Sequence, residues 1–152
     1  MKFVLLPFVA CGCLAFLSQV GTVEAAEPIL AGPITAEVDR VVDGDTVRVN
    51  ANIWVDQRVN VSVRLAGIDA PEIFRPKCPA EKQKGLAARD FINAIMGEQT
   101  IRLKDVQNGK YAGRVVGRIE LADGRDLGAV LIDADLAAPQ KPRQKKPDWC
   151  GA

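Results

Sequence analysis

Three short segments with alternating apolar and polar residues constrain the fold of this chain more than any other feature. The first spans residues 34–42, a turn signal follows at residues 43–45 (DGD), and alternation resumes over residues 46–49. In the third segment, residues 59–65, every second residue is apolar. Alternation with this period predicts strands with one buried face, and short turn signals predict antiparallel neighbours. We therefore expect a meander of three strands.

The remaining periodic segments complete a small fold of mixed class. Residues 80–96 lack proline and place apolar side chains at helical spacing, and a glycine follows them. Two more strands are predicted over residues 100–106 and 115–121, and a short helix over residues 126–138. Five strands with a helix after the third predict an α+β fold, a five-stranded Greek-key β-barrel of the OB type packed by helices.

The N-terminus has the composition of a secretory signal peptide. Met1 and Lys2 precede an apolar run over residues 3–17, and no acidic residue occurs before Glu24 in a small-x-small cleavage pattern. We expect residues 1–25 to be the signal peptide, residues 26–33 a linker and residues 34–152 the folded domain.

Two other interpretations of the leader stay open: a buried N-terminal helix, and a lipoprotein anchor through Cys11 or Cys13. The apolar run is shorter than the roughly 20 residues that a membrane-spanning helix needs. We therefore expect no stable membrane insertion after cleavage, and a monomeric protein that is secreted or periplasmic.

Cysteine and histidine content limits the available chemistry. Cys11 and Cys13 leave with the predicted leader, so Cys78 and Cys150 remain and most simply pair in an oxidising compartment. The chain has no histidine. This excludes mechanisms that use an imidazole base, and two thiols alone are too few ligands for zinc.

The charge of the whole chain gives no sign of a nucleic-acid partner. The formal net charge is +1, so any field that binds phosphate must come from local arginines and lysines. The only dense basic run is residues 141–146, and we interpret it as a solvated surface segment.

Three acidic residues are predicted to meet at one end of the barrel. Asp45 follows the first turn, and Asp69 and Glu72 follow the third strand. Carboxylate and carbonyl oxygens are the ligands that Ca²⁺ prefers, and a cation beside a phosphate offsets charge in the transition state. Arg64 and Arg114 are fork-shaped donors suited to phosphate oxygens.

The order of three motifs is more informative than any one of them. The motifs are residues 40–47 (RVVDGDTV), 63–72 (VRLAGIDAPE) and 110–114 (KYAGR). Taken singly, each also fits an ordinary turn, loop or surface strand. Together they resemble the staphylococcal nuclease (thermonuclease) family over roughly residues 34–138. The resemblance is closest to small exported bacterial members, some of them associated with succinoglycan production.

The resemblance implies a Ca²⁺-dependent endonuclease that hydrolyses phosphodiester bonds of DNA or RNA on an OB-type barrel. It implies that Ca²⁺ is held by Asp45, Asp69 and the main-chain carbonyl of Ala70.

It also implies roles for five further residues. Arg64 and Arg114 would bind the scissile phosphate and stabilise the transition state. Glu72 would orient or deprotonate the attacking water. Lys110 and Tyr111 would contact the terminal phosphate of a bound nucleotide.

The sequence departs from the family pattern at two positions near Arg114. Ala112 is inserted between Tyr111 and Gly113, and Gly109 stands where the family usually has aspartate. Two alternative functions stay open. One is an OB barrel that binds nucleic acid or oligosaccharide without cutting it. The other is an accessory protein of exopolysaccharide (succinoglycan) biosynthesis.

Overall fold

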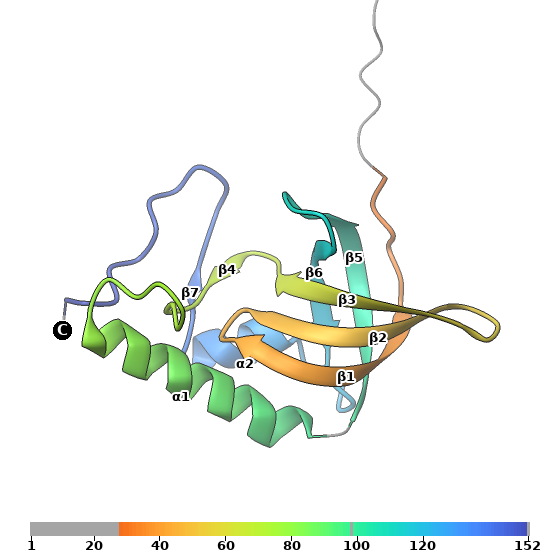
Figure 1. The fold of residues 1–152 in the computed structure, drawn as a ribbon, viewed down its shortest axis with the longest axis horizontal. Helices are drawn as coiled ribbons and strands as arrows, with labels where there is room; N and C mark the ends of the chain where they lie inside the picture. The colour runs from red at the N-terminus through yellow and green to blue at the C-terminus, as the bar shows by residue number, and fades with distance from the viewer. Residues whose placement is uncertain (1–27, 98, 152) are drawn as a thin grey trace, which may run out of the picture.

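In the computed structural model, which describes residues 28–97 and 99–151, five strands close into a barrel in the order β1-β2-β3-β6-β5 (Figure 1). Neighbouring strands are antiparallel except β3 and β6, which are parallel. The predicted meander and the predicted five-stranded α+β barrel are confirmed. The strands are β1 (Ile34–Asp43), β2 (Thr46–Trp54), β3 (Gln57–Leu65), β5 (Thr100–Asn108) and β6 (Arg114–Glu120).

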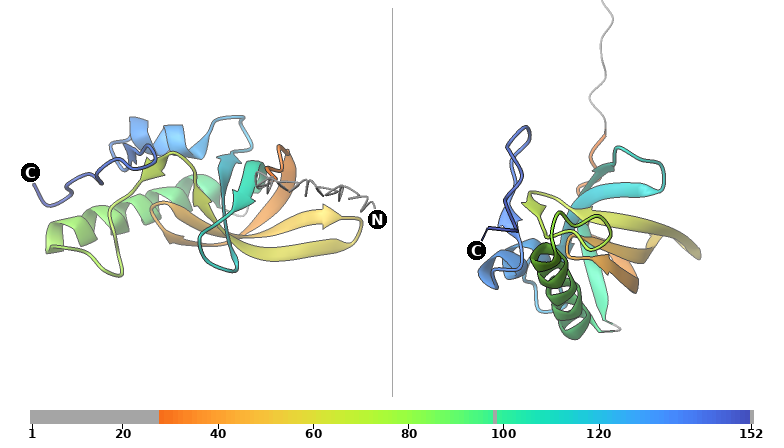
Figure 2. Two further views of the ribbon diagram at one scale, coloured as in Figure 1. Left: turned by 90° about the horizontal axis from the view of Figure 1, so that it is seen from above. Right: turned by 60° about the vertical axis from the view of Figure 1, so that its left-hand side comes forward.

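Two helices and a small second sheet complete the fold. Helix α1 is Pro79–Met96 and helix α2 is Leu127–Asp133. Strands β4 (Ile68–Asp69) and β7 (Ala138–Pro139) form the two-stranded sheet. The C-terminus and the tip of the β2–β3 hairpin lie at opposite ends of the molecule (Figure 1; Figure 2). Within the described ranges, no helix has the length and hydropathy that a membrane crossing requires.

The core fills the barrel and the space beneath the helices. Alternate residues of the strands point inward, as strand geometry requires. Helix α1 adds a buried stripe at helical spacing that ends in Ile92 and Met96, and α2 adds Leu127 and Leu131. Each of these four side chains is fully buried, so both helices are held against the barrel mainly by burial of apolar surface.

The second helix is shorter than the predicted range 126–138. It begins after Asp126, whose side chain accepts a hydrogen bond from the N–H of Ala129 at 3.0 Å. It ends at Asp133 because Asp135 adopts a left-handed conformation with φ of 57°. Aspartate tolerates this conformation better than most residues, and the sequence carries no glycine there as a signal.

The N-terminal part of the described chain joins the barrel earlier than the sequence suggests. The predicted signal peptide, residues 1–25, lies outside the described residues. Leu30, in the segment interpreted as a linker, pairs with Val106 through two main-chain hydrogen bonds of 2.8 Å each. Contact with the barrel therefore begins several residues before β1.

Candidate active site

The turn between β1 and β2 places Asp45 at the end of the barrel that faces α1. A Cβ atom on Gly44 would lie 2.8 Å from the Cβ of Ala70 and 2.9 Å from that of Ala88. Only glycine lets this turn pack so closely against both the β4 loop and the helix. Asp45 is buried behind the turn and accepts a hydrogen bond of 2.9 Å from the Thr46 hydroxyl.

Arg64 links the two buried carboxylates of the site. It lies opposite Thr46 in the β2–β3 register, near the end of β3. Its Nη1 is 2.5 Å from Asp45 Oδ2, and its Nη2 is 3.5 Å from Asp69 Oδ1. Asp45 and Asp69 are only 5% and 2% exposed. Because an unpaired buried charge is strongly destabilising, one guanidinium stabilises both carboxylates.

The Arg64 guanidinium does not fully compensate the negative charge of the buried Asp45 carboxylate. Burial raises the pKa of Asp45 to about 6, since desolvation outweighs the opposing effect of the Arg64 guanidinium and the nearby Asp43 raises it further. Buried carboxylate oxygens that lack full compensation are the donors to which a hard cation binds.

The residues present fit a Ca²⁺ site of the kind the resemblance implies. Asp45 and Asp69 supply two buried carboxylates that contact one guanidinium, and the buried Ala70 follows Asp69 directly. Residues 28–97 and 99–151 contain no group of three or more acidic or thiol side chains spaced to hold a metal by themselves. Main-chain oxygen and water would therefore have to complete the coordination shell.

Glu72 lies beside this pair on a loop that a buried residue holds in place. The carboxylate of Glu81, near the start of α1, accepts hydrogen bonds from the main-chain N–H groups of Glu72 at 3.5 Å and Lys77 at 2.5 Å. Glu81 therefore closes the loop that carries Glu72. Glu81 was not among the site residues predicted from the sequence. A capping pattern, with glutamate three residues after the N-cap Cys78, could have revealed it.

The basic tail also reaches the site. Lys146 Nζ is 2.9 Å from Asp69 Oδ1 and 3.5 Å from Glu72 Oε1. The hydrogen bond to Asp69 raises the pKa of Lys146. Residues 141–146 are exposed, as a solvated surface segment should be, and Lys146 in addition contacts the carboxylates of the site. Nothing in the local sequence signals this contact, because Lys146 and Asp69 are far apart in the chain.

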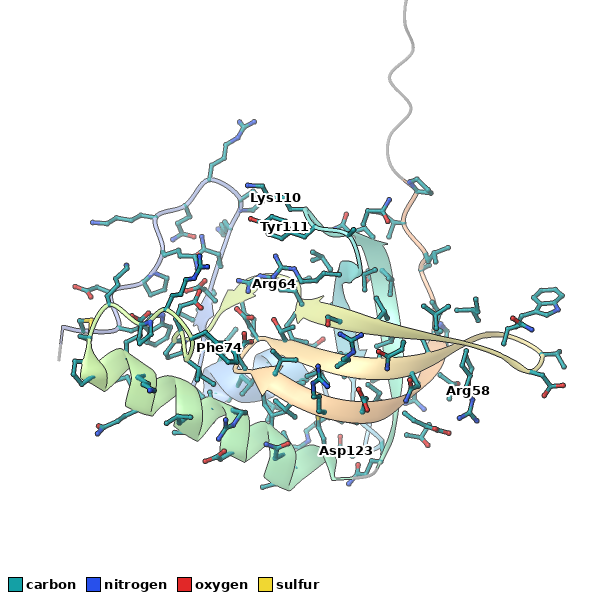
Figure 3. The ribbon with its side chains drawn as sticks, viewed as in Figure 1. Arg58, Arg64, Phe74, Lys110, Tyr111 and Asp123 are labelled. Carbon is teal, nitrogen blue, oxygen red and sulfur yellow. A yellow bond between two sulfur atoms is a disulfide. The ribbon has the colours of Figure 1, made fainter. Side chains whose placement is uncertain are left out.

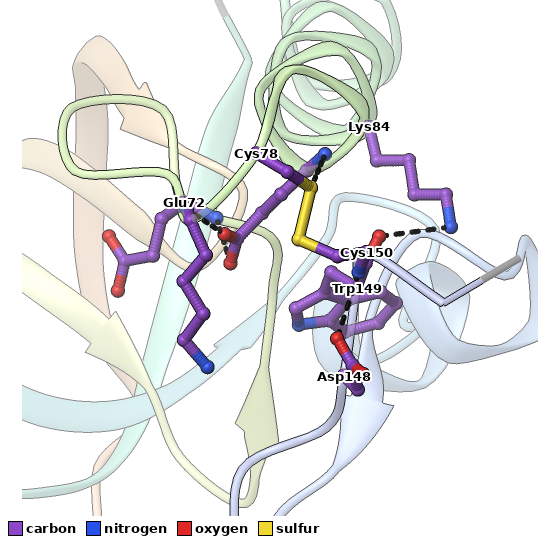
Figure 4. The surroundings of a disulfide bond; sticks show 8 residues. Glu72, Cys78, Lys84, Asp148, Trp149 and Cys150 are labelled. Atoms are coloured by element: carbon purple, nitrogen blue, oxygen red, sulfur yellow. Dashed lines mark hydrogen bonds between the residues drawn. A yellow bond between two sulfur atoms is a disulfide. The ribbon is translucent and has the colours of Figure 1, made fainter.

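A disulfide bond joins the tail to the start of α1 (Figure 4). Cys78 and Cys150 are bonded, with Cα atoms 6.1 Å apart. Nearby, the Lys84 ammonium donates to the carbonyl oxygen of Trp149 at 3.3 Å, and the Trp149 indole N–H donates to Asp69 Oδ2 at 3.4 Å. The disulfide bond expected from the sequence is therefore present, and Trp149, the neighbour of Cys150, contacts the Asp69 carboxylate.

Arg114 begins β6 on the same outer face as Arg64. Arg114 is opposite Ser62 in the parallel β3–β6 register, whereas Arg64 is opposite Val116. The two arginine Cα atoms are therefore on the order of 8 Å apart, from the spacing of strands and the rise per residue. This separation allows two long side chains to reach one phosphate group.

The structure does not bring Arg114 to the carboxylates themselves. Its guanidinium carbon lies 5.1 Å from the centre of the Tyr111 ring, and Lys110 Nζ lies 5.7 Å from the same ring. In the described part of the chain, the buried Nε of Arg114 has no hydrogen-bond partner. Such an orphaned donor fits a site that receives an anion. Figure 3 shows Lys110, Tyr111 and Arg64 on one side of the barrel.

The turn that carries Tyr111 accommodates the inserted Ala112. Arg114 N donates to the carbonyl of Tyr111 at 3.2 Å, and Gly113 adopts a φ of 75°. The N–H of Gly109 donates to the carbonyl of Arg114 at 3.0 Å and closes the loop. The extra residue is therefore contained within the turn, and Arg114 still starts the strand.

The fold and the site define a class: an OB-type barrel with buried carboxylates, a shared arginine and further cations at one end. The chain belongs to the staphylococcal nuclease family, since the family model described as "Staphylococcal nuclease homologue" matches residues 62–148. The family predicted from the resemblance of the three motifs is thereby confirmed.

Three relatives agree with this membership. A protein of Escherichia coli named "Uncharacterized endonuclease" is 30% identical over 110 residues, which cover 72% of this chain and 63% of the relative. The "Thermonuclease" of Staphylococcus hyicus is 30% identical over 107 residues, covering 70% and 60%. The "Thermonuclease" of Staphylococcus intermedius is 34% identical over 87 residues, covering 57% and 48%. The chain thus spans less than two thirds of the length of each of these relatives.

Proposed function

We propose that this protein is an exported, Ca²⁺-dependent endonuclease that hydrolyses phosphodiester bonds of DNA, RNA or both. The observation that carries the proposal is the meeting of Asp45, Arg64, Asp69 and Glu72 at one end of the barrel, with Arg64 in contact with both aspartates. Membership of the staphylococcal nuclease family supports the same reaction class.

The arginines bind and stabilise the reacting phosphate in this proposal. Arg64 and Arg114 lie on one outer face of adjacent strands, and both present planar donors that match phosphate oxygens. Donors fixed before the reaction stabilise charge as it develops on the phosphoryl oxygens. The buried and unpartnered Nε of Arg114 would gain an acceptor when the phosphate binds.

Glu72 orients the attacking water and accepts its proton. Its carboxylate is 43% exposed, unlike those of the two aspartates, so water can reach it. The loop clamp made by Glu81 fixes the main chain of Glu72 and so limits where the carboxylate can lie. A positioned carboxylate can serve as a general base without any imidazole.

Asp45, Asp69 and the main-chain carbonyl of Ala70 would hold the Ca²⁺ ion. When bound, the ion would polarise a phosphoryl oxygen and offset the negative charge of the transition state. The buried carboxylates also fit a cation because their positive partners compensate them incompletely. Arg64 is shared between the two aspartates, and Lys146 is half-exposed.

Lys110 and Tyr111 would contact a terminal phosphate of the substrate. Tyr111 is 59% exposed on the β5–β6 turn, where the cation of Lys110 lies near its ring. Contacts of this kind are to phosphate and not to base edges, so we expect weak base preference and binding that weakens as salt rises.

Export to an oxidising compartment, either secretion or the periplasm, is part of the proposal. The disulfide between Cys78 and Cys150 supports it, because such bonds persist outside the reducing cytosol. The predicted signal peptide over residues 1–25 points to the same location.

One assay tests the proposed function directly. Protein purified after export is incubated with plasmid DNA and with RNA, in Ca²⁺ or in excess chelator. We expect cleavage of at least one substrate in Ca²⁺ and none in chelator. The Glu72→Gln protein, purified identically, controls for contaminating nucleases. Undiminished cleavage in chelator contradicts the proposal.

A further inference from the structure

The segment of residues 140–150, here named the strap, is fixed at both ends across the proposed metal site. At its start, Gln140 N donates to the carbonyl of Gly67 at 2.8 Å, directly after the β4–β7 pairing. At its end, Cys150 is bonded to Cys78. The strap therefore has little freedom to leave the carboxylates while the disulfide is intact.

Lys146 is the charged residue of the strap that forms ion pairs in the site. Its ammonium lies within ion-pair distance of both Asp69 and Glu72, and a cavity of about 200 Å³ lies beside it. The Lys146 side chain is 53% exposed, so it can swing away into solvent. Lys145, its neighbour, makes no ion pair with any residue that the structure describes.

The ammonium of Lys146 and a metal ion would compete for the same carboxylate, that of Asp69. Asp69 Oδ1 already accepts from Lys146 at 2.9 Å and from Arg64 at 3.5 Å, and Asp69 Oδ2 accepts from Trp149 at 3.4 Å. A cation coordinated by Asp69 would be repelled by the two positive donors, Lys146 and Arg64, that already contact this carboxylate. Lys146 is the half-exposed one with a flexible stem, whereas Arg64 is also paired to Asp45.

We propose that Lys146 is a built-in competitor for the metal site, and that the Cys78–Cys150 disulfide holds it there. This inference rests on the proposed function, since it requires that Asp69 binds Ca²⁺. A tethered cation acts at an effective concentration in the millimolar range. Removing the ammonium, or freeing the strap by reduction, therefore tightens Ca²⁺ binding.

The test is Ca²⁺ affinity, measured by isothermal titration calorimetry on the full exported protein. Lys146→Met should bind Ca²⁺ about 2- to 5-fold more tightly, the order expected for losing a partly exposed ion pair. Lys145→Met is the matched control, with the same change of charge in the same segment, and should stay within about twofold of the wild type. Reduced wild-type protein should resemble Lys146→Met.

A second readout follows the strap itself. Trp54→Phe leaves Trp149 as the only tryptophan, because the chain has two. Since its indole contacts Asp69, Ca²⁺ should change its fluorescence along the same binding curve. Asp45→Asn should abolish both the heat and the fluorescence change, which assigns them to this site.

The outcomes separate the two proposals. Equal or weaker Ca²⁺ affinity in Lys146→Met than in the wild type overturns the competitor inference and leaves the proposed function standing. Absence of Ca²⁺ binding in both proteins overturns the metal site, and with it the proposed function. Unchanged affinity on reduction overturns the assignment of the disulfide as the holder of Lys146.

Discussion

The two ends of the β2–β3 hairpin, here named the site end (near α1) and the tip, both depart from the usual pattern in which apolar side chains are buried and charged ones are exposed. At the end near α1, Asp45 and Arg64 are charged residues packed into the protein. At the tip, Trp54 and Val55 are apolar residues that are 78% and 76% exposed. The same two strands thus bury charge at one end and expose apolar surface at the other (Figure 1).

The two ends therefore differ in what they contribute to activity and to stability. Buried charges cost free energy, and the site end retains them only because Arg64 and Lys146 compensate the carboxylates. The exposed side chains at the tip contribute little burial and contact none of the site. Substitutions at the site end should therefore change activity and stability, and substitutions at the tip should change neither appreciably.

Replacing Arg64 by lysine should lower activity far more than changes to the disulfide, to Gly44 or to the tip. An ammonium keeps the charge but cannot contact both aspartates and a phosphate oxygen with a planar fork. We expect cleavage in Ca²⁺ to fall about 10²- to 10³-fold, the range for losing one preorganised donor. Single-turnover cleavage of a labelled oligonucleotide measures this. Arg58→Lys, near the tip, is the matched control, and an equal loss there would remove the contrast between the two ends.

Removing the disulfide should lower the stability of the whole domain. The bond closes a loop with a sequence separation of 72, which is worth about 4 kcal/mol in the chain-entropy model. The double variant Cys78→Ser/Cys150→Ser isolates this effect, because serine preserves the N-cap of α1. Urea unfolding followed by circular dichroism gives the free energy. A change below about 1 kcal/mol would show that the strap is not energetically coupled to the barrel.

Gly44→Ala should damage the site end through packing alone. The new methyl group would collide with Ala70 and Ala88, neither of which can move far. We expect a loss of about 1–3 kcal/mol, the usual effect of overpacking. Gly151→Ala is the control, since its methyl group would meet no atom closer than 3.5 Å. Equal unfolding temperatures of the two variants would contradict the close approach at Gly44.

Trp54→Ser should give the smallest effect. The residue is at the tip and largely exposed, so we expect a stability change within about 0.5 kcal/mol and unchanged cleavage. Thermal unfolding and the oligonucleotide assay both check this. A tenfold fall in cleavage would show that the tip contributes to the substrate site.

The alternation of residues 34–65 was enough to predict the meander, because inward and outward positions follow directly from strand geometry. The same strand pairing predicted that Asp45 and Glu72 would lie together at one end of the barrel, whereas the contact of Arg64 with Asp45 was not predicted. Asp69 could be placed with them because it closely follows the third strand.

The contact of Lys146 with Asp69 could not be predicted in this way. It depends on the course of an irregular tail that no periodicity describes, and only the pairing of Cys78 with Cys150 limits where that tail lies. Glu81 was missed for a different reason. A buried glutamate at the start of a helix has an ordinary capping pattern, and its two acceptor contacts are to the irregular loop that directly precedes the helix.

We propose above that the site end of the barrel hydrolyses phosphodiester bonds, with Glu72 as the group that accepts the proton of the attacking water. Single-turnover cleavage by Glu72→Gln, with Glu37→Gln as the control for an exposed glutamate elsewhere, tests it most directly. We expect a loss of about 10²- to 10⁴-fold for Glu72→Gln, with unchanged Ca²⁺ binding and circular dichroism, and no loss for the control. Full activity of Glu72→Gln would contradict it.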